Sequence, residues 1–427
     1  MRIPWNVRAS PAHVWLFDLL FGGAPTVRWA PAGALPAGYE RADQFALLSA
    51  APGRTFVLSL GARRGASSAL TSYNSLRSGR TRLVRRVLGL GLRTGLAQPL
   101  LQDKIDIGVM RDAPSAARAE DLLGDHLRDF FGRGPVVMAI GSGSGPYRKP
   151  VLQVFAADGT PLGYIKVGWN DWTREAVRRE ATALQACLKH QTRLGVPPLL
   201  GLTSWRGLDL LVTGPLPRRI RGLGIESELP DTRVLREISD LAPGLTSELA
   251  ASPWWLSVCS RIQDVGDPVV RSALEQAAER IEGAHGHVPL TFGAWHGDLV
   301  PWNLGWCGTR LYAWDWESST PDVPLGFDAV HFYYSVAFIA RQRPLADAAA
   351  FAAGRGDAAL DALGVPGRAR QLVATLHLIE LALRHEEARR STDEVDGRFY
   401  PAVTQVLERV LAPSSQLAGP QSAGRTA

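Results

Sequence analysis

The stretch from Trp295 to Glu317 reads Trp-His-Gly-Asp-Leu-Val-Pro-Trp-Asn-Leu-Gly-Trp-Cys-Gly-Thr-Arg-Leu-Tyr-Ala-Trp-Asp-Trp-Glu and decides the fold prediction. A short hairpin over 304–314 is predicted, because two short apolar runs flank a turn that contains glycine. This hairpin would return Asp315 to the loop that holds Asp298 and Asn303. Three oxygen-bearing side chains are therefore expected to converge.

Convergent oxygen ligands of this kind suit phosphoryl transfer to a hydroxyl group. That reaction needs a carboxylate to orient or deprotonate the acceptor, and oxygen ligands to hold Mg²⁺ against the phosphates of a nucleotide. Asp298 is the candidate catalytic residue, and Asn303 and Asp315 are the candidate metal ligands. The stretch therefore predicts a catalytic loop followed by a metal-binding strand end.

The stretch resembles the aminoglycoside phosphotransferase and choline-kinase-like family of small-molecule kinases, which shares the protein-kinase fold. The family motif His-Gly-Asp-x-x-x-x-Asn is matched from His296 to Asn303, and its Asp-Trp-Glu motif is matched from Asp315 to Glu317. The resemblance covers about 130–390. It implies an α+β, bilobal fold with a small β-rich N-lobe and a helical C-lobe, and it implies ATP and Mg²⁺ as cofactors.

The segment before this stretch has the pattern expected of the N-lobe. It shows strand, glycine-rich loop, two strands joined by Asp158-Gly159, a helix and two further strands, in that order. The predicted elements are strands at 136–140, 151–157 and 162–167, a helix at 173–190, and strands at 199–203 and 208–213.

Candidate nucleotide-binding residues follow from the same resemblance. The loop Gly141, Ser142, Gly143, Ser144 and Gly145 would bring backbone amides close to phosphate oxygens. The remaining candidates are Lys166 on the third strand, Glu180 on the helix with Glu175 as the fallback partner, and Gly214 and Leu216 in the hinge that would bind adenine. The loop departs from the protein-kinase pattern Gly-x-Gly-x-x-Gly, because Pro146 follows Gly145 directly.

Two residues near the catalytic loop have structural interpretations. His296 is interpreted as supporting the loop rather than as an acid or base. Asp328, in Leu-Gly-Phe-Asp-Ala-Val, either caps a helix or ties down the catalytic loop.

Beyond residue 220 the sequence is mainly helical. Helices are predicted at 230–250, 266–284, 325–341, 345–363, 367–390 and 397–411. We expect four parts: a basic α+β N-terminal accessory domain at 1–130, an N-lobe at 131–217, a helical C-lobe at 218–411, and a disordered tail at 412–427.

The charge of the chain is divided unevenly. Residues 1–130 carry 17 Lys and Arg against 10 Asp and Glu, whereas the remaining residues carry 30 against 31. The high pI, near 9.5, therefore comes from the excess of basic residues in the N-terminal third. The kinase-like region is nearly neutral, so we expect no overall electrostatic field there that would attract a polycationic acceptor. No acidic residue lies between Asp43 and Asp103, and a basic amphipathic helix over 75–96, weakened by Gly89 and Gly91, is predicted there.

Three interpretations of the stretch Arg77–Arg93 stay open: a solvated or packed cover, a surface that binds membrane, or one that binds an acidic partner or nucleic acid. Its arginines are not interleaved with tryptophans, so we expect no nucleic-acid partner. Three cysteines, no export signal and no long apolar run predict a cytoplasmic protein, with peripheral binding at the inner membrane surface left open.

The sequence thus predicts an ATP-dependent kinase whose acceptor is a hydroxyl group of a sugar, an aminoglycoside or an amino-alcohol-like molecule. Acidic residues outside the motifs either form a cationic pocket or are solvated: Glu226, Glu228, Asp231, Asp393, Glu394 and Asp396. Protein phosphorylation is disfavoured because no activation segment follows Asp315. The alternative is a non-catalytic nucleotide-binding module that docks through its basic N-terminal domain to a membrane or a protein complex.

Overall fold

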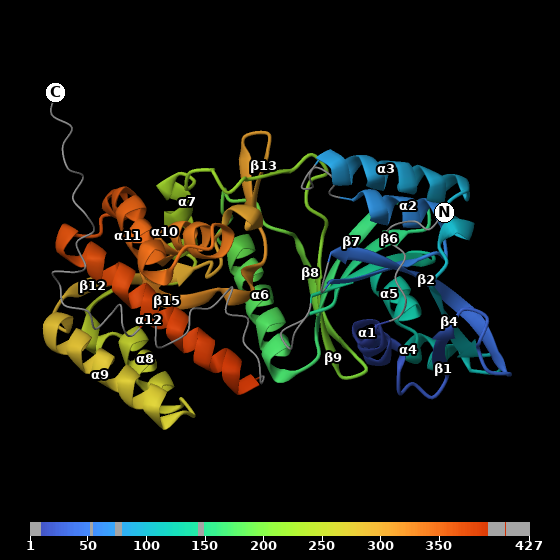
Figure 1. Ribbon diagram of the computed structural model, residues 1–427, viewed down its shortest axis with the longest axis horizontal. Helices are drawn as coiled ribbons and strands as arrows, with labels where there is room; N and C mark the ends of the chain where they lie inside the picture. Colours follow the sequence, from blue (N-terminus) through green and yellow to red (C-terminus); the bar gives the residue numbers. More distant parts are fainter. Residues whose placement is uncertain (1–9, 52–53, 73–78, 144–148, 392–405, 407–427) are drawn as a thin grey trace. The chain divides into compact units, whose positions relative to one another are not determined.

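The computed structural model describes residues 10–51, 54–72, 79–143, 149–391 and 406. The chain forms two compact units, which we call the sheet unit (up to Ala181, with Pro197–Arg221) and the helical unit (Thr182–Val196, with Gly222 onward). Both contain helices and strands, so the α+β class is confirmed (Figure 1). No helix among the described residues has the length and apolar character needed to cross a membrane.

One antiparallel sheet of nine strands forms the centre of the sheet unit, in the order β1-β4-β2-β3-β5-β6-β7-β9-β8. The strands are β1 (Val27–Pro31), β2 (Tyr39–Ala51), β3 (Arg54–Ser59), β4 (Lys104–Met110), β5 (Val136–Ser142), β6 (Val151–Ala156), β7 (Pro161–Gly168), β8 (Leu199–Trp205) and β9 (Leu208–Thr213). The helices are α1 (Pro11–Phe21), α2 (Arg63–Thr71), α3 (Gly79–Thr94), α4 (Ser115–Asp121) and α5 (Leu123–Phe131), together with the first part of α6 (Asp171–Lys189), whose residues from Thr182 onward belong to the helical unit.

Each face of this sheet has its own core, because side chains alternate between the faces along a strand. Phe45 and Leu47 pack with the apolar side chains of α1 and α5. Ala46 and Leu48 pack with those of α2 and α3 on the other face. Figure 1 shows the two pairs of helices on opposite sides of the sheet.

The sheet continues across the expected boundary between residues 130 and 131. β3, from the N-terminal third, pairs with β5, the first strand expected of the N-lobe, with Val57 opposite Ile140. The N-terminal 130 residues and the strands expected of the N-lobe therefore belong to one compact unit. Backbone hydrogen bonds between distant strands produce this arrangement, and no local sequence pattern marks such pairing.

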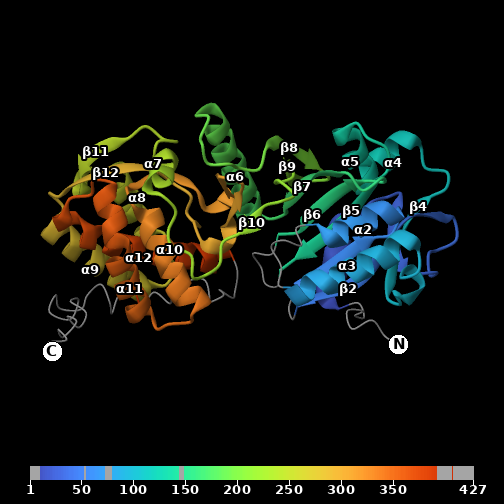
Figure 2. The ribbon, with the colours of Figure 1, turned by 90° about the horizontal axis from the view of Figure 1, so that it is seen from above.

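The helical unit contains α7 (Thr232–Ser239), α8 (Pro253–Gln263), α9 (Pro268–His285), α10 (Phe327–Ser335), a π-helical turn at Val336–Ala340, α11 (Leu345–Ala362) and α12 (Gly367–Ser391), as Figure 2 shows. Its strands are β11 (Leu245–Glu248), β12 (Pro289–Trp295), β13 (Leu304–Cys307), β14 (Arg310–Ala313) and β15 (Thr320–Pro324). β10 (Arg221–Gly222) lies where the first unit passes into the second. The fully buried large side chains include Trp255, Trp295, Trp316, Phe327 and Tyr334.

Most predicted elements of the helical unit form, including the hairpin of β13 and β14, where Trp306 lies opposite Leu311. The predicted helix at 230–250 is wrong in its second half. It ends at Ser239, and β11 follows after Pro243 and Gly244, which do not continue a helix. The predictions at 397–411, apart from Val406, and at 412–427 lie outside the described residues.

Candidate active site

An ion pair on the sheet unit joins a strand to the following helix. Lys166 lies on β7 and Glu180 on α6, and the Lys166 ammonium pairs with the Glu180 carboxylate. The two side chains are 18% and 3% exposed, so the pair is largely removed from water. The fallback residue Glu175 instead pairs with Arg179, one turn along the same helix.

The described part of the predicted glycine-rich loop consists of the end of β5 and the residue after it, Gly143. Gly141 and Ser142 still belong to the strand, where Gly141 lies opposite Phe56 on one side and Val151 on the other. Ser142 is buried and its hydroxyl donates to the carbonyl of Gly143. Ser144 and Gly145, the other predicted members of the loop, lie outside the described residues.

The hinge candidates follow β9. The amide of Gly214 donates to the carbonyl of Pro198 at 2.6 Å. A Cβ atom at Gly214 would lie 3.1 Å from the Pro198 ring, so a side chain there would press on this contact. Leu216 is half-buried two residues further on.

The catalytic-loop candidates lie at the end of β12 in the helical unit. The side-chain amide of Asn303 donates to the Asp298 carbonyl at 3.1 Å and to Asp298 Oδ2 at 2.9 Å. Asn303 is 5% exposed. Its two hydrogen bonds fix the orientation of the Asp298 carboxylate and direct Asn303 Nδ2 toward Asp298, so Asn303 Oδ1 faces elsewhere.

Asp315 lies two residues after the end of β14 and has a left-handed backbone conformation, with φ of 72°. The amide of Trp314 donates to the carbonyl of Asn303 at 3.1 Å, which holds this strand end against the loop as predicted. Glu317 places a carboxylate oxygen within 4.8 Å of one from Asp315. Glu317 was not among the predicted metal ligands, although it belongs to the quoted Asp-Trp-Glu motif.

This donor set fits a hard divalent cation. Mg²⁺ prefers oxygen ligands and is commonly bound in proteins by one or two carboxylates together with phosphate oxygens and water. Asn303 Oδ1 and the carboxylates of Asp315 and Glu317 are donors of that kind. The helical unit therefore offers a candidate Mg²⁺ site made of oxygen atoms only.

Asp328 anchors the catalytic loop from α10. Its carboxylate accepts hydrogen bonds from the amides of His296 at 2.8 Å and Gly297 at 3.2 Å. Burial raises the pKa of Asp328 to about 6, although these amides and the nearby His331 and Arg384 lower it. Of the two interpretations of Asp328, tying down the loop is confirmed, because Gly326 is the residue at the helix cap.

Arg384 of α12 supports the same loop from the other side. It donates to the carbonyls of Gly297 at 2.9 Å and Ser318 at 3.1 Å, and its guanidinium stacks on Trp295. Glu380 pairs with Arg384 at 3.0 Å and with Arg261 at 2.7 Å. Burial alone would raise the pKa of Glu380, but the two arginines hold it below its ordinary value.

Two buried histidines form a chain of contacts that begins at Asp298. His331 Nε2 lies 3.4 Å from Asp298 Oδ1 and 3.2 Å from the Ser335 hydroxyl. His331 Nδ1 lies 3.1 Å from His377 Nε2. Neither histidine is predicted from the sequence, because only the packing of α10 against α12 brings them to the loop. The one available signal was a histidine three residues after Asp328, on the helix that anchors the loop.

His296 is fully buried against Trp316, with the ring centres 4.3 Å apart. Its Nδ1 lies 3.3 Å from the amide of Asp298. Burial lowers the pKa of His296 to about 4, against the opposing effects of Asp298 and Asp315. A neutral ring that accepts the amide hydrogen of Asp298 agrees with the supporting role expected for it.

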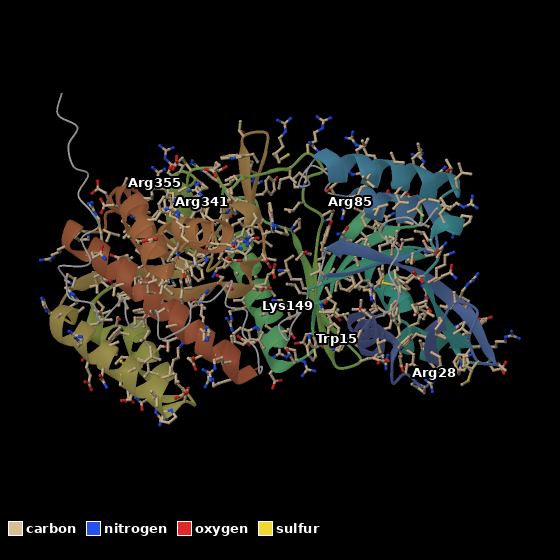
Figure 3. All side chains as sticks on the ribbon, in the orientation of Figure 1. Trp15, Arg28, Arg85, Lys149, Arg341 and Arg355 are labelled. Atoms are coloured by element: carbon tan, nitrogen blue, oxygen red, sulfur yellow. The ribbon has the colours of Figure 1, made fainter. Side chains whose placement is uncertain are left out.

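Among the acidic residues considered for a cationic pocket, the three that the structure describes already have partners. Glu226 pairs with Arg341 at 2.6 Å, and Glu228 pairs with Arg355 and accepts a hydrogen bond from Tyr333 at 3.2 Å. Figure 3 labels both arginines in the helical unit. Asp231 is the N-cap residue of α7, and its carboxylate accepts a hydrogen bond from the amide of Arg233 at 2.9 Å. Asp393, Glu394 and Asp396 lie outside the described residues.

No protein-family model matches the chain. No curated protein matches it in sequence. Solved structures do match, among them a choline kinase, LicA, from Streptococcus pneumoniae, with 13% identity, a TM-score of 0.40, and coverage of 63% of this chain and 89% of that one.

Two further matches have similar values. A putative fructosamine-3-kinase from Thermobifida fusca has 17% identity and a TM-score of 0.41, over 68% of this chain and 99% of that one. A thermostable mutant of the aminoglycoside phosphotransferase APH(4)-Ia, in a complex with ADP and hygromycin B, has 13% identity and a TM-score of 0.44, over 68% of this chain and 99% of that one. Such distant likeness carries no argument about activity, so the function proposed below stands on the residues themselves.

Proposed function

We propose that this chain is an ATP-dependent phosphotransferase that moves the γ-phosphate to a hydroxyl group of a small molecule. The observation that supports it best is the pair of hydrogen bonds from Asn303 to Asp298. A carboxylate held in one orientation beside an oxygen-ligand set is what transfer to a hydroxyl requires.

In the proposed reaction the acceptor oxygen attacks the γ-phosphorus, the bond to the β–γ bridging oxygen breaks, and ADP leaves. The proton of the acceptor hydroxyl passes to the Asp298 carboxylate. Asn303 on Oδ2 and His331 on Oδ1 keep that carboxylate from rotating. Asn303, Asp315 and Glu317 would hold Mg²⁺, which neutralises phosphate charge when bound.

The sheet unit has the nucleotide-binding role in this proposal. Lys166, oriented by Glu180, binds the α- and β-phosphates. The loop Gly141, Ser142, Gly143, Ser144 and Gly145 supplies backbone amides to phosphate oxygens, and the backbone of Gly214 and Leu216 binds the adenine edge. The need for Lys166 to keep its charge explains why a buried glutamate accompanies it.

The acceptor we propose is a sugar or another neutral polyol rather than a polycation. Glu226 and Glu228 are neutralised by Arg341 and Arg355, and Asp231 is engaged as a helix cap. A surface that has paired its own carboxylates with arginines offers little attraction to a polyamine.

The test is release of ADP by the purified chain with ATP and Mg²⁺, against a panel of sugars, amino alcohols and aminoglycosides. Asp298→Asn is expected to lose at least about 1000-fold in turnover while keeping the thermal shift that ATP produces. Asp240→Asn is the matched control, because Asp240 is exposed in the same unit. Near-normal turnover of Asp298→Asn would contradict the catalytic assignment. An ATP-induced thermal shift without transfer to any acceptor would favour the nucleotide-binding module instead.

A further inference from the structure

Helix α3 has two apolar stripes. The inner stripe contains Leu88 and Leu92, which are 8% and 2% exposed and belong to the core under α2. Gly89 assists this packing, because a Cβ atom there would lie 2.7 Å from the Thr71 methyl group. This stripe packs the helix against the sheet unit.

The outer stripe has no such packing. Leu83, Val87 and Leu90 are 64%, 66% and 64% exposed. They lie on one line along the helix, because positions i, i+4 and i+7 fall on the same face of an α-helix. Leu96 and Leu100, which follow the helix, are 76% and 51% exposed. Single exposed apolar side chains are ordinary, but an ordered row of them marks a surface that meets something apolar.

Arginines border the outer stripe. Arg82, Arg86 and Arg93 are exposed and lie on the adjacent line of the helix. Among the residues that the structure describes, these three form no ion pair or side-chain hydrogen bond with one another or with any other group. Figure 3 shows nitrogen-tipped side chains along the side of α3 that faces away from α2.

The surroundings of α3 contain no compensating charge from their own sequence. No acidic residue occurs between Asp43 and Asp103, a stretch that includes β3, α2 and α3. The positive charge of the arginines that border the outer stripe is therefore available to an anionic partner.

We propose that the outer stripe of α3 docks on an anionic lipid surface, with Leu83, Val87 and Leu90 inserted among the headgroups and Arg82, Arg86 and Arg93 bound to lipid phosphates. Helices that lie in a membrane interface combine these two features, an apolar row and a basic border. Each arginine close to an anionic leaflet strengthens binding severalfold, and the apolar row supplies binding that salt does not screen.

Other occupants fit these observations less well. A second copy of the chain would bring the same arginines face to face, where like charges repel. Nucleic acid would meet a helix that has no aromatic side chain for stacking on bases. An acidic protein would satisfy the arginines but would leave the apolar row to be matched separately. The surface proposal is independent of the kinase proposal, because none of its residues belongs to the candidate active site.

The experiment is co-sedimentation of the full chain with vesicles of phosphatidylcholine alone and with vesicles that also contain phosphatidylglycerol. Binding is expected only to the anionic vesicles and is expected to weaken with added NaCl. Arg82→Gln with Arg86→Gln should weaken partitioning about 25-fold. Leu83→Ser, Val87→Ser and Leu90→Ser together should weaken it at least about tenfold and leave no binding at high salt.

The matched control is Arg111→Gln with Arg133→Gln, which removes two exposed arginines from the same unit away from α3. This control is expected to bind like the unsubstituted chain. Circular dichroism and melting temperature check that each variant is folded, which is expected because all substituted side chains are exposed. Absence of vesicle binding would overturn the proposal, and so would equal binding to neutral vesicles or equal loss in the control. Self-association or nucleic-acid binding that the α3 variants abolish, without vesicle binding, would assign the stripe to that partner instead.

Discussion

The Asp298 carboxylate lies 3.4 Å from His331 Nε2, and the other ring nitrogen of His331 lies 3.1 Å from His377 Nε2. Both oxygens of Asp298 are thus in contact with a neighbour, because Oδ2 accepts from Asn303. His331 comes from α10, the same helix whose Asp328 holds the amides of His296 and Gly297. One helix therefore positions both the backbone of the catalytic loop and its carboxylate.

His331→Phe is expected to lower kcat roughly 10- to 100-fold with little change in the KM for ATP, because Asp298 loses the contact at Oδ1 and turns more freely. His331→Gln should retain most activity, since its amide nitrogen can occupy the place of Nε2 and donate to Oδ1. Steady-state kinetics of both variants measures this, with melting temperature as the check on folding. If the Gln variant is as impaired as the Phe variant at equal stability, His331 does not act through Asp298.

Gly297→Ala is expected to destabilise the helical unit by more than about 2 kcal/mol and to abolish activity. Gly297 has φ of +80°, and a Cβ atom there would lie 2.1 Å from the Ser318 carbonyl oxygen. Gly308→Ala is the control, because Gly308 has φ of +60° but no atom within 4 Å of the added carbon. It should cost about 1 kcal/mol, from backbone strain alone. Urea unfolding separates the two, and equal losses would mean that the contact with Ser318 relaxes.

Lys166→Met and Glu180→Gln are each expected to lower kcat/KM for ATP about 100-fold, because either change removes the ion pair that positions the ammonium group. The double variant should be no worse than the worse single variant, since both act on one interaction. Arg178→Met is the control. Arg178 lies on α6, as Glu180 does, and pairs with Asp209 of β9, but the Arg178 side chain is 56% exposed. Losses in the double variant that equal the sum of the two single losses would show that Lys166 and Glu180 act separately.

The stability of the folded chain is expected to depend on buried histidines at acidic pH. Burial lowers the pKa of His296 to about 4 and that of His377 well below its ordinary value, where His331 and Arg384 add to the effect. Histidine in the unfolded chain titrates near 6.5, so the unfolded state binds more protons between about pH 6.5 and 4. The free energy of unfolding therefore falls as the pH drops through this window, by about 3 kcal/mol for His296.

Two buried carboxyls act in the opposite sense. Burial raises the pKa of Asp328 and of Asp43 to about 6, so the native state binds their protons first as the pH falls below that value. Urea unfolding at a series of pH values should show a shallower acid slope for His296→Gln than for the unsubstituted chain. The same substitution at His285, which is exposed, should leave the slope unchanged. An unchanged slope in His296→Gln would show that folding does not lower the pKa of this ring.

The local order of residues 295–317 was enough to predict several features of the site. The hairpin of β13 and β14 forms as expected, because two short apolar runs on either side of a glycine turn are close in sequence and can pair with each other. The contact of Asn303 with Asp298 spans five residues of one loop. Lys166 and Glu180 lie only 14 residues apart, on a strand and on the helix that follows it, so their contact is also local in sequence.

The parts of the site that were not predicted depend on pairs far apart in sequence. His331 and His377 are 46 positions apart, and Arg384 reaches Gly297 across 87 positions. The residue spacing within each segment does not indicate either contact, because the packing of distant elements decides which of their faces meet. For the same reason, the sequence could not show whether Glu226 and Glu228 form ion pairs or are solvated, because their arginine partners are more than 100 positions away.

The sequence by itself determined the chemistry-bearing motifs, the uneven charge and the basic amphipathic character of α3, since these depend on residue type and short-range order. Only the tertiary structure decided that β3 pairs with β5, which makes the basic N-terminal third part of a nine-stranded sheet. It also decided which stripe of α3 is buried and which is exposed. The physical reason is that strand pairing and helix packing join surfaces from distant segments. The free energy of those contacts depends on both segments together and cannot be inferred from either one alone.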